Sequence, residues 1–244
     1  MKMPSCGDFE CGHHDSIAVM DATMAALDPE QAPVVVIANR GLAVRIEDGH
    51  LSTEERAREA KFIRQEDRQR FRTTHFLKRR VCAAFTGIQP ERMNFGTGWN
   101  NKPYLKEFTG LFAFNLSHSG EWGGIAAAKA NALGFDVQAA IELADFPMSE
   151  IMHPLDCIRA DSPASAALVW AVKEAVTKAN GIGLGYALKK LCIKRTSDDA
   201  VKSVQLLGQQ WFVRHGLLAD GSAIAVAMNT WVQMEKIQLL EVKF

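Results

Sequence analysis

The chain has 244 residues, of which 48% are hydrophobic and 23% charged, a composition typical of a globular protein with one large or two small domains. The 28 acidic and 28 basic residues balance, so net charge gives no support for a nucleic-acid partner. No apolar run reaches membrane-spanning length, and residues 1–10 lack the apolar core of a signal peptide. We therefore expect neither nucleic acid nor a membrane among the partners.

The first predicted elements are strands followed by a helix. Residues 33–38 form a β-branched run typical of a strand, and residues 41–46 are expected to continue the sheet after a turn. Ser52 and Glu55 have the spacing of a capping box, which predicts a helix over residues 52–64. This part of the chain therefore predicts a strand region that leads into helices.

A second helix and a strand meander are predicted next. The helix is expected over residues 67–85, where apolar side chains recur at helical spacing, and Gly87 ends it. Three apolar runs separated by turns then follow, at 111–116, 123–129 and 133–137. Their low polarity predicts strands that are buried on both faces or lie at a domain junction.

The last third of the chain is predicted to form one helix followed by strands. Ser162 and Pro163 provide an N-cap oxygen and a proline at the first helical position, and the helix is expected to end near Asn180 with Gly181 as a left-handed cap. A tight turn at residues 219–221 predicts a hairpin. The expected strands are 189–195, 210–217, 222–228 and 237–244.

This order of strand, helices, strands, helix and strands predicts an α+β chain in two halves of similar size. We predict an N-terminal half over residues 31–130 and a C-terminal half over 131–244, after a mobile N-terminal segment, residues 1–30. The chain length and this division predict a monomer.

The cysteines favour a reducing compartment. Their number, five, is odd and they are widely scattered, which argues against a disulfide framework, so we expect a cytoplasmic protein. Cys6, Cys11, His13 and His14 resemble a zinc cluster, but no second ligand pair with finger-like spacing follows. We interpret them as incidental ligands on a mobile terminal segment.

Basic residues gather in residues 56–80, although the whole chain is neutral. Ten residues of this stretch are Lys or Arg and only three are acidic. A local basic stripe on a neutral protein favours a small anionic ligand over a long polyanion.

Three charged side chains are candidates for metal and phosphate chemistry. Asp136 lies at the end of an apolar strand, where a buried carboxylate needs a cation or hydrogen-bond donors, although it is equally compatible with a solvent-facing position. Glu174 and Lys178, four residues apart, share one helix face. Either the two residues form a surface ion pair, or Glu174 binds a metal ion while Lys173 or Lys178 neutralises phosphate or accepts a proton.

Ser117, His118 and Ser119 suggest a nucleophile beside a base. A hydrolase of that kind needs a G-x-S-x-G elbow or an orienting acid, and neither is evident in the sequence. His118 fits better as a phosphate hydrogen-bond donor beside the basic stripe, with a core histidine as the alternative. Lys102 is held next to the rigid Pro103 after a polar turn.

In this order the segments resemble the 4′-phosphopantetheinyl transferases of the large, monomeric type that activates peptide and polyketide synthases. The resemblance covers about residues 52–195, including the basic helical stretch 52–80. The matching residues are Asn101-Lys102-Pro103, Phe114-Asn115-Leu116-Ser117-His118-Ser119, Gly134-Phe135-Asp136-Val137, Trp170-x-x-Lys173-Glu174-Ala175-x-x-Lys178 and Gly181-x-Gly183-Leu184.

The resemblance implies a pseudo-dimer of two similar α+β halves with the active site in the cleft between them. It also implies transfer of the 4′-phosphopantetheine arm of coenzyme A to a serine of an apo acyl or peptidyl carrier protein, which releases 3′,5′-ADP. Magnesium is the expected cation. Because the carrier's helix is typically acidic, we expect it to dock beside basic and apolar surface near the cleft.

The resemblance also implies roles for the acidic residues. Asp136 and Glu174 would hold Mg²⁺ against the diphosphate, with Gln138 as a neutral ligand, and Lys178 would contact phosphate or help the proton leave. Glu174 or Glu150, directly or through a metal-bound water, would deprotonate the carrier serine. The expected catalytic residues are thus Asp136, Glu174 and Lys178.

Coenzyme A is expected to bind mainly through basic side chains, with its 3′-phosphate at Arg58 and neighbouring residues. Two departures from the family pattern stand out, because Gln138 replaces a second carboxylate and Glu55 stands where a basic phosphate contact often occurs. The first departure motivates an alternative, a degenerate coenzyme A or carrier-binding module without turnover. The expected contacts are Arg58, Arg70, Lys102, Ser117, His118, Lys173 and Lys178.

Overall fold

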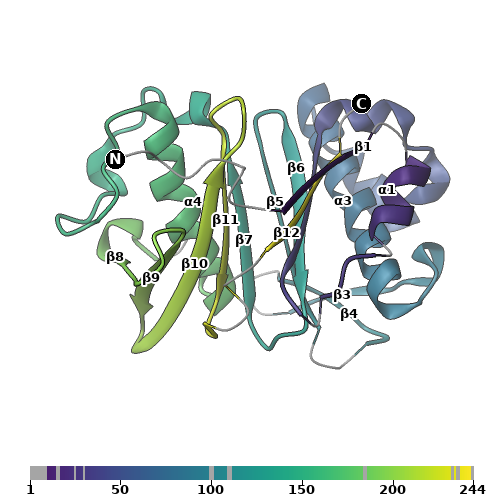
Figure 1. Cartoon of the computed structure of the whole chain (residues 1–244). Helices are drawn as coiled ribbons and strands as arrows, with labels where there is room; N and C mark the ends of the chain where they lie inside the picture. The colour runs from purple at the N-terminus through teal and green to yellow at the C-terminus, as the bar shows by residue number, and fades with distance from the viewer. Residues whose placement is uncertain are drawn as a thin grey trace.

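The computed structural model describes residues 10–14, 17–24, 26–29, 31–98, 102–108, 112–183, 186–231, 234 and 237–242. These residues form two five-stranded sheets and a small two-stranded one. The large sheets lie between two helical layers, with α4 (Pro163–Asn180) on one outer side and α3 (Gln65–Thr86) on the other (Figure 1). Two halves, each with a sheet and a long helix, confirm the predicted α+β fold class.

The first sheet combines strands from both ends of the chain. β1 runs parallel to β12, β12 runs parallel to β2, and the remaining neighbours are antiparallel. β5 forms one edge of this sheet. In spatial order the strands are β1 (Glu10–His14), β12 (Gln238–Val242), β2 (Val34–Asn39), β6 (Trp122–Ala128) and β5 (Ala113–Ser119).

Three helices accompany the first sheet. α1 (Ile17–Met24) and α2 (Thr53–Glu59) are short, and α3 covers the outer face of the sheet with Phe76, Leu77 and Val81 in the core. The predicted capping box is present, because Ser52 and Glu55 exchange hydrogen bonds at the start of α2. α3 ends at Gly87, whose positive φ of 70° favours glycine.

The second sheet is antiparallel throughout and carries α4 on its outer face. α4 begins with a Ser162 capping box and ends at the left-handed Gly181, as predicted. In spatial order its strands are β7 (Leu133–Gln138), β11 (Ala223–Met228), β10 (Gln209–Leu217), β9 (Val201–Leu206) and β8 (Ile193–Arg195).

Shorter elements connect these layers. β3 (Phe95–Thr97) and β4 (Pro103–Leu105) form the two-stranded sheet. Short 3-10 helices lie at Arg40–Arg45, Asp48–His50, Pro90–Arg92, Ala140–Leu143, Met148–Glu150 and Leu188–Lys190.

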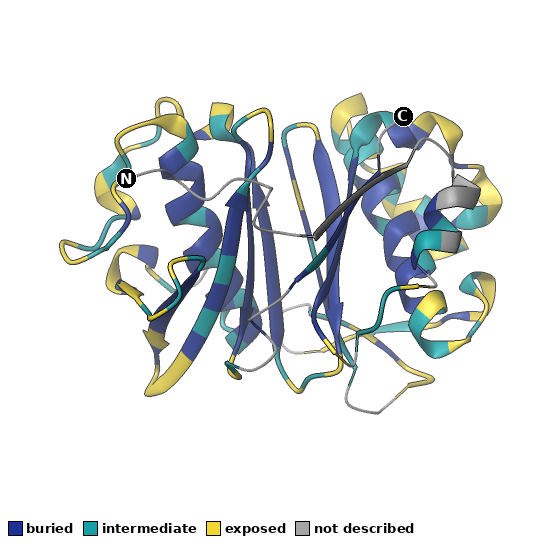
Figure 2. Ribbon diagram, viewed as in Figure 1, coloured by how far each residue is buried: buried dark blue, intermediate teal, exposed yellow. Residues whose placement is uncertain are grey.

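The inner faces of the two sheets pack on each other. Figure 2 shows the buried residues concentrated in the strands between the two helical layers. Val35 and Ile37 of the first sheet meet Phe135 and Val226 of the second in one apolar cluster. On the outer face, α4 approaches β7 closely, because a Cβ on Gly134 would lie 1.9 Å from the carbonyl oxygen of Ala175. Glycine is therefore required at position 134 for α4 to pack against β7.

Two sequence-based expectations differ from the structure. Residues 41–46 do not continue the sheet, because the Asn39 side chain caps a 3-10 helix over Arg40–Arg45. β9, which the sequence analysis missed, lies between β8 and β10. In residues 1–30, whose mobility stays a prediction, β1 pairs with β12 and α1 buries Met20 and Met24.

The ends of the chain also bear on two further expectations. β12 belongs to the predicted C-terminal half but pairs with β2 in the sheet of the first half. The division at residues 130 and 131 remains a prediction. Of the four residues that resemble a zinc cluster in the sequence, Cys6 lies outside the described residues, and Cys11, His13 and His14 belong to β1. Among the helices that the structure describes, none is both long and apolar enough to cross a bilayer.

A buried histidine in β10 makes stability depend on pH. His215 is 1% exposed, and neither ring nitrogen has a hydrogen-bond partner in the described parts of the chain. Burial lowers its pKa to about 3, and the charges of Lys202 and Arg214 add to this effect. In the unfolded chain His215 therefore takes up a proton below pH ~6.5, whereas in the folded chain it stays neutral until the pH falls to about 3. Protonation of the unfolded chain in this range lowers the free energy of unfolding.

We expect His215 to remove about 1.4 kcal/mol from the free energy of unfolding for each pH unit below 6.5. Urea unfolding of wild type and His215→Leu at pH 7, 6 and 5 measures this difference in slope. A residual slope is expected in the variant, because burial also lowers the pKa of His75 to about 4. Equal slopes in the two proteins would contradict the prediction.

Candidate active site

A cavity of about 830 Å³ opens beside the seam where the two sheets meet. This volume is in the upper part of the range typical of small-molecule sites. Its walls come from α2, α3, β3, β5, β7 and α4, so both halves contribute. Polar lining residues include Arg58, His75, Lys78, Lys102, Asn115, Ser117, His118, Ser119, Asp136, Gln138, Glu142, Glu174 and Lys178.

Side chains of β5 join the edge strands of the two sheets. Asn115, Ser117 and Ser119 are alternate residues, so they share one face of the strand. The Asn-x-Ser-x-Ser pattern therefore builds the seam beside the cavity, and no hydrolytic nucleophile is needed to explain it. The three bonds join Asn115 Oδ1 to Phe135 N, Ser117 Oγ to Asp136 Oδ1, and Ser119 Oγ to Ala139 N, at 2.9, 2.6 and 2.8 Å.

Two carboxylates meet around one ammonium group in this cavity. Asp136, which is 2% exposed, accepts hydrogen bonds at Oδ1 from Ser117 and from Lys178 Nζ, the latter at 2.7 Å. Lys178 Nζ also lies 3.2 Å from Glu174 Oε1, and Trp170 Nε1 donates to Glu174 Oε2. Asp136 and Glu174, 38 positions apart in the sequence, thus contact the same ammonium group.

The protonation states of Asp136 and Lys178 follow from their surroundings. Burial raises the pKa of Asp136, the Lys178 ammonium opposes the rise, and the Glu174 carboxylate adds to it. Burial would lower the pKa of Lys178, but Asp136 and Glu174 hold it above its ordinary value. Lys178 is therefore a persistent cation in this arrangement, suited to contact phosphate and unsuited to accept a proton.

The acidic donor set fits a hard divalent cation. Asp136 Oδ2 is buried and has no hydrogen-bond partner among the described residues, an arrangement that is costly unless something else satisfies it. Glu174 and Gln138 line the same cavity and bring further oxygen atoms. Mg²⁺ prefers such oxygen ligands and retains several waters, so a complete protein cage is not required.

Two cavity residues that the sequence reading did not select belong to a buried ion cluster. His75 and Lys78 both contact Glu55, with a His75 Nδ1–Glu55 Oε1 distance of 3.1 Å. Arg79 donates to the other Glu55 oxygen at 2.7 Å. Although burial opposes it, hydrogen bonds from His75 and Lys78 hold the pKa of Glu55 well below its ordinary range. Glu55 therefore fixes the positions of His75 and Lys78 on the cavity wall.

Lys102 and His118, two of the expected phosphate contacts, both line the cavity, and their role stays a prediction. Lys102 Nζ donates to the main-chain oxygens of Leu133 at 2.9 Å and Lys178 at 3.1 Å, and burial lowers its pKa to about 8. The His118 side chain is exposed, yet the protein around its ring, together with Arg70 and Lys178, lowers its pKa. His118 is thus a neutral hydrogen-bonding group near pH 7.

Lys173 is a correction to the expected ligand-binding set. Its side chain is 0% exposed, and Nζ donates to Ile151 O and Asp156 Oδ2, both at 2.6 Å. It therefore does not line the cavity. Lys173 and Glu174 are consecutive in α4, so their side chains point in different directions.

Arg70 and Glu150 are not among the residues that line the cavity. Arg70 donates to Gly120 O at 2.7 Å and pairs with Asp67, which holds it beside the β5–β6 turn. Glu150 is exposed and its carboxylate lies 3.2 Å from Lys189 Nζ. Arg58, by contrast, lines the cavity, with its guanidinium 5.7 Å from the ring centroid of Phe71.

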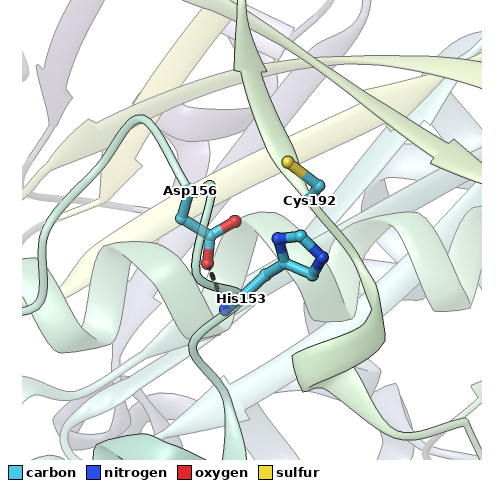
Figure 3. A group of neighbouring side chains, drawn as sticks. All are labelled: His153, Asp156 and Cys192. Carbon is cyan, nitrogen blue, oxygen red and sulfur yellow. Dashed lines mark hydrogen bonds between the residues drawn. The ribbon is translucent and has the colours of Figure 1, made fainter.

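A second group of potential metal ligands lies behind α4. Ligand atoms of His153, Asp156 and Cys192 lie within 4.8 Å of one another (Figure 3). The Asp156 carboxylate is already satisfied, because it accepts from His153 N at 2.8 Å, Ile193 N at 2.7 Å and Lys173 Nζ. Both Asp156 oxygens thus already accept hydrogen bonds, whereas Asp136 Oδ2 in the cavity accepts none among the described residues, so we interpret the group as a structural anchor.

Comparison with known proteins adds family information to this geometry. A model described as 4′-phosphopantetheinyl transferase, N-terminal, matches residues 46–130, and one for the 4′-phosphopantetheinyl transferase superfamily matches 132–227. The chain is 28% identical over 208 residues to a phosphopantetheinyl transferase from Thraustochytrium sp., covering 76% of this chain and 72% of the relative. It is 28% identical over 162 residues to the 4′-phosphopantetheinyl transferase psf-1 of Bacillus pumilus, covering 64% and 68%.

Proposed function

We propose that this chain, which belongs to the 4′-phosphopantetheinyl transferase superfamily, transfers the 4′-phosphopantetheine arm of coenzyme A to a serine of an apo acyl or peptidyl carrier protein. The observation that carries the proposal is the meeting of Asp136, Glu174 and Lys178 in a cavity between the two halves. This transfer needs acidic residues that bind a divalent metal ion and a positively charged side chain that contacts phosphate.

Magnesium is the proposed metal, held by Asp136, Glu174 and Gln138. The buried, unpartnered Asp136 Oδ2 among the described residues supports this choice. When bound, Mg²⁺ neutralises negative charge that develops on the diphosphate. Lys178, kept protonated by its two acidic neighbours, supplies a second positive charge. Together these groups would hold the diphosphate in position for attack.

The remaining cavity residues are proposed to orient coenzyme A. Ser117, His118 and Lys102 lie near the acidic group and would contact the diphosphate, His118 as a neutral hydrogen-bond donor. Arg58 would receive the 3′-phosphate, with Lys78 close by on the same wall. These assignments follow the distribution of positive charge around the cavity.

Glu174 is the proposed proton acceptor. In the transfer, the serine oxygen forms a bond to the phosphorus of the phosphopantetheine arm, and the bond from that phosphorus to the bridging oxygen breaks. The serine proton passes to the Glu174 carboxylate and 3′,5′-ADP leaves. Lys178 is less suited to this role, because its acidic neighbours raise its pKa.

The proposal is tested by incubating the purified chain with coenzyme A, Mg²⁺ and a panel of apo acyl and peptidyl carrier proteins, followed by intact-mass measurement. At least one carrier is expected to gain the mass of a phosphopantetheine group, and chelation of the metal is expected to prevent it. No mass gain on any carrier, combined with coenzyme A binding that is indifferent to Mg²⁺ in calorimetry, would favour a binding module without turnover.

We also infer a cytoplasmic monomer. Cys82, Cys157 and Cys192 are free thiols, as is usual in a reducing compartment. Both walls of the cavity come from one chain, so a second copy is not needed to complete it. Size-exclusion chromatography with light scattering is expected to give a mass near 26.9 kDa.

A further inference from the structure

The amide group of Gln138 has a defined orientation beside the acidic site. Gln138 and Asp136 are two residues apart on β7, so they share a face of the strand. The Gln138 side chain is buried, and Nε2 donates to Glu142 Oε2 at 3.1 Å and to Ala139 O at 3.3 Å. Both hydrogen bonds of this side chain that the structure describes are donated by Nε2, and neither engages Oε1. The oxygen is thus available to a ligand.

Glu142 is itself held in place. It lies in the 3-10 helix that follows β7, and its carboxylate lines the cavity. Ser119 Oγ donates to Oε2 at 2.6 Å and the main-chain N of Gly120 donates to Oε1 at 3.0 Å. Both donors come from the end of β5 and the turn that follows it. The carboxylate is therefore a fixed acceptor next to the Gln138 amide.

This contact decides which atom of the amide faces the cavity. An ionised carboxylate accepts hydrogen bonds and has no proton to donate, so the amide group that faces Glu142 must be NH₂. The opposite orientation would put two oxygen acceptors against each other and turn two N–H donors toward the cation. Gln138 can serve as a metal ligand only through its oxygen.

We propose that Glu142 is a positioning residue that turns Gln138 Oε1 toward the divalent cation, an inference that rests on the proposed magnesium-dependent transfer. Gln138 occupies the position at which the family pattern has a second carboxylate. A carboxylate presents an oxygen in either orientation, whereas an amide needs a partner to fix it. Glu142 supplies that partner from outside the strand.

The test is a double-mutant cycle on cation affinity. Mn²⁺ is titrated calorimetrically into protein saturated with coenzyme A, using wild type, Glu142→Ala, Gln138→Glu and the double variant. In the wild-type background, Glu142→Ala is expected to weaken Mn²⁺ binding by about tenfold or more, the effect typical of a lost ligand-orienting contact. In the Gln138→Glu background, the same change is expected to leave affinity unchanged or to raise it, because residues 138 and 142 then repel each other.

Glu121→Ala is a matched control, because Glu121 is an exposed acid in the neighbouring turn and pairs with Arg40. It removes the same charge and is expected to leave Mn²⁺ affinity unchanged. Glu142→Gln, which keeps the side-chain volume, is expected to weaken binding less than Glu142→Ala does, because its own oxygen can still accept from Gln138. Thermal melts of all variants check that each one is folded.

Two results would overturn the inference alone. One is wild-type affinity in Glu142→Ala. The other is an equal loss of Mn²⁺ affinity on Glu142→Ala in the wild-type and the Gln138→Glu backgrounds. That result would indicate that Glu142 binds the ion directly or acts through its charge alone. If the wild-type protein binds no Mn²⁺ at all, both the inference and the proposed metal dependence fail, so the two failures are distinguishable.

Discussion

Asp136→Asn is expected to lower kcat/KM for transfer to an apo carrier protein by about 10²–10³-fold, the range typical for loss of one electrostatic group in a catalytic site. The substitution keeps the side-chain shape and removes the charge that would hold the cation. Asp136 Oδ2 is buried without a partner among the described residues, and burial raises the pKa of this carboxyl. The neutral amide is therefore expected to leave Tm unchanged or to raise it.

Intact-mass kinetics on one carrier, with a thermal melt of each variant, measure both effects. Glu174→Gln is expected to cause a loss of similar size, and the double variant little more, because residues that act as one unit are not additive. Glu150→Gln is expected to retain activity, since Glu150 is exposed and pairs with Lys189. Near-wild-type turnover by folded Asp136→Asn would contradict the assignment of this carboxylate to the metal.

These expectations link the seam to activity. Ser117 reaches across from β5 and binds Asp136, so the edge strand of one sheet fixes a candidate metal ligand on the other. Lys102 makes a similar connection to the main chain at the start of β7 and near the end of α4. The site therefore depends on how the two halves fit together, and neither half alone contains it.

Local signals in the sequence predicted the elements that carry the site. The Ser162 cap and the left-handed Gly181 define α4, and both are encoded by residues next to the helix ends. β7 was equally legible as an apolar run that ends near Asp136. The convergence of Asp136 with Glu174 and Lys178 was implied by family resemblance, because no local pattern reports a contact across 38–42 positions.

Contacts between distant segments could not be predicted in this way. The pairing of β12 with β2 joins residues about 200 positions apart, and strand patterns carry no information on such partners. Glu142 was missed for a similar reason, since its partners Ser119 and Gly120 lie in a separate turn. Lys173 was different, because its position next to Glu174 already indicated that both could not face one cavity.

Lys173→Met is expected to reduce the free energy of unfolding by about 3–5 kcal/mol, the usual cost of removing one partner of a buried ion pair. Both Lys173 and Asp156 have side chains that are 0% exposed, and their charged atoms lie 2.6 Å apart. Without the ammonium, the donors to Asp156 among the described residues are the main-chain N–H groups of His153 and Ile193. For a chain of this length the loss corresponds to a Tm decrease of roughly 6–20 °C.

The same experiment separates structure from ligand binding. Because Lys173 does not line the cavity, folded Lys173→Met is expected to keep the wild-type KM for coenzyme A at a temperature well below its Tm. Lys173→Met combined with Asp156→Asn is expected to recover part of the lost stability, since no unpaired charge stays buried. A raised KM with an unchanged Tm would instead mean that Lys173 contacts coenzyme A, and the interpretation of the group behind α4 as an anchor would be wrong.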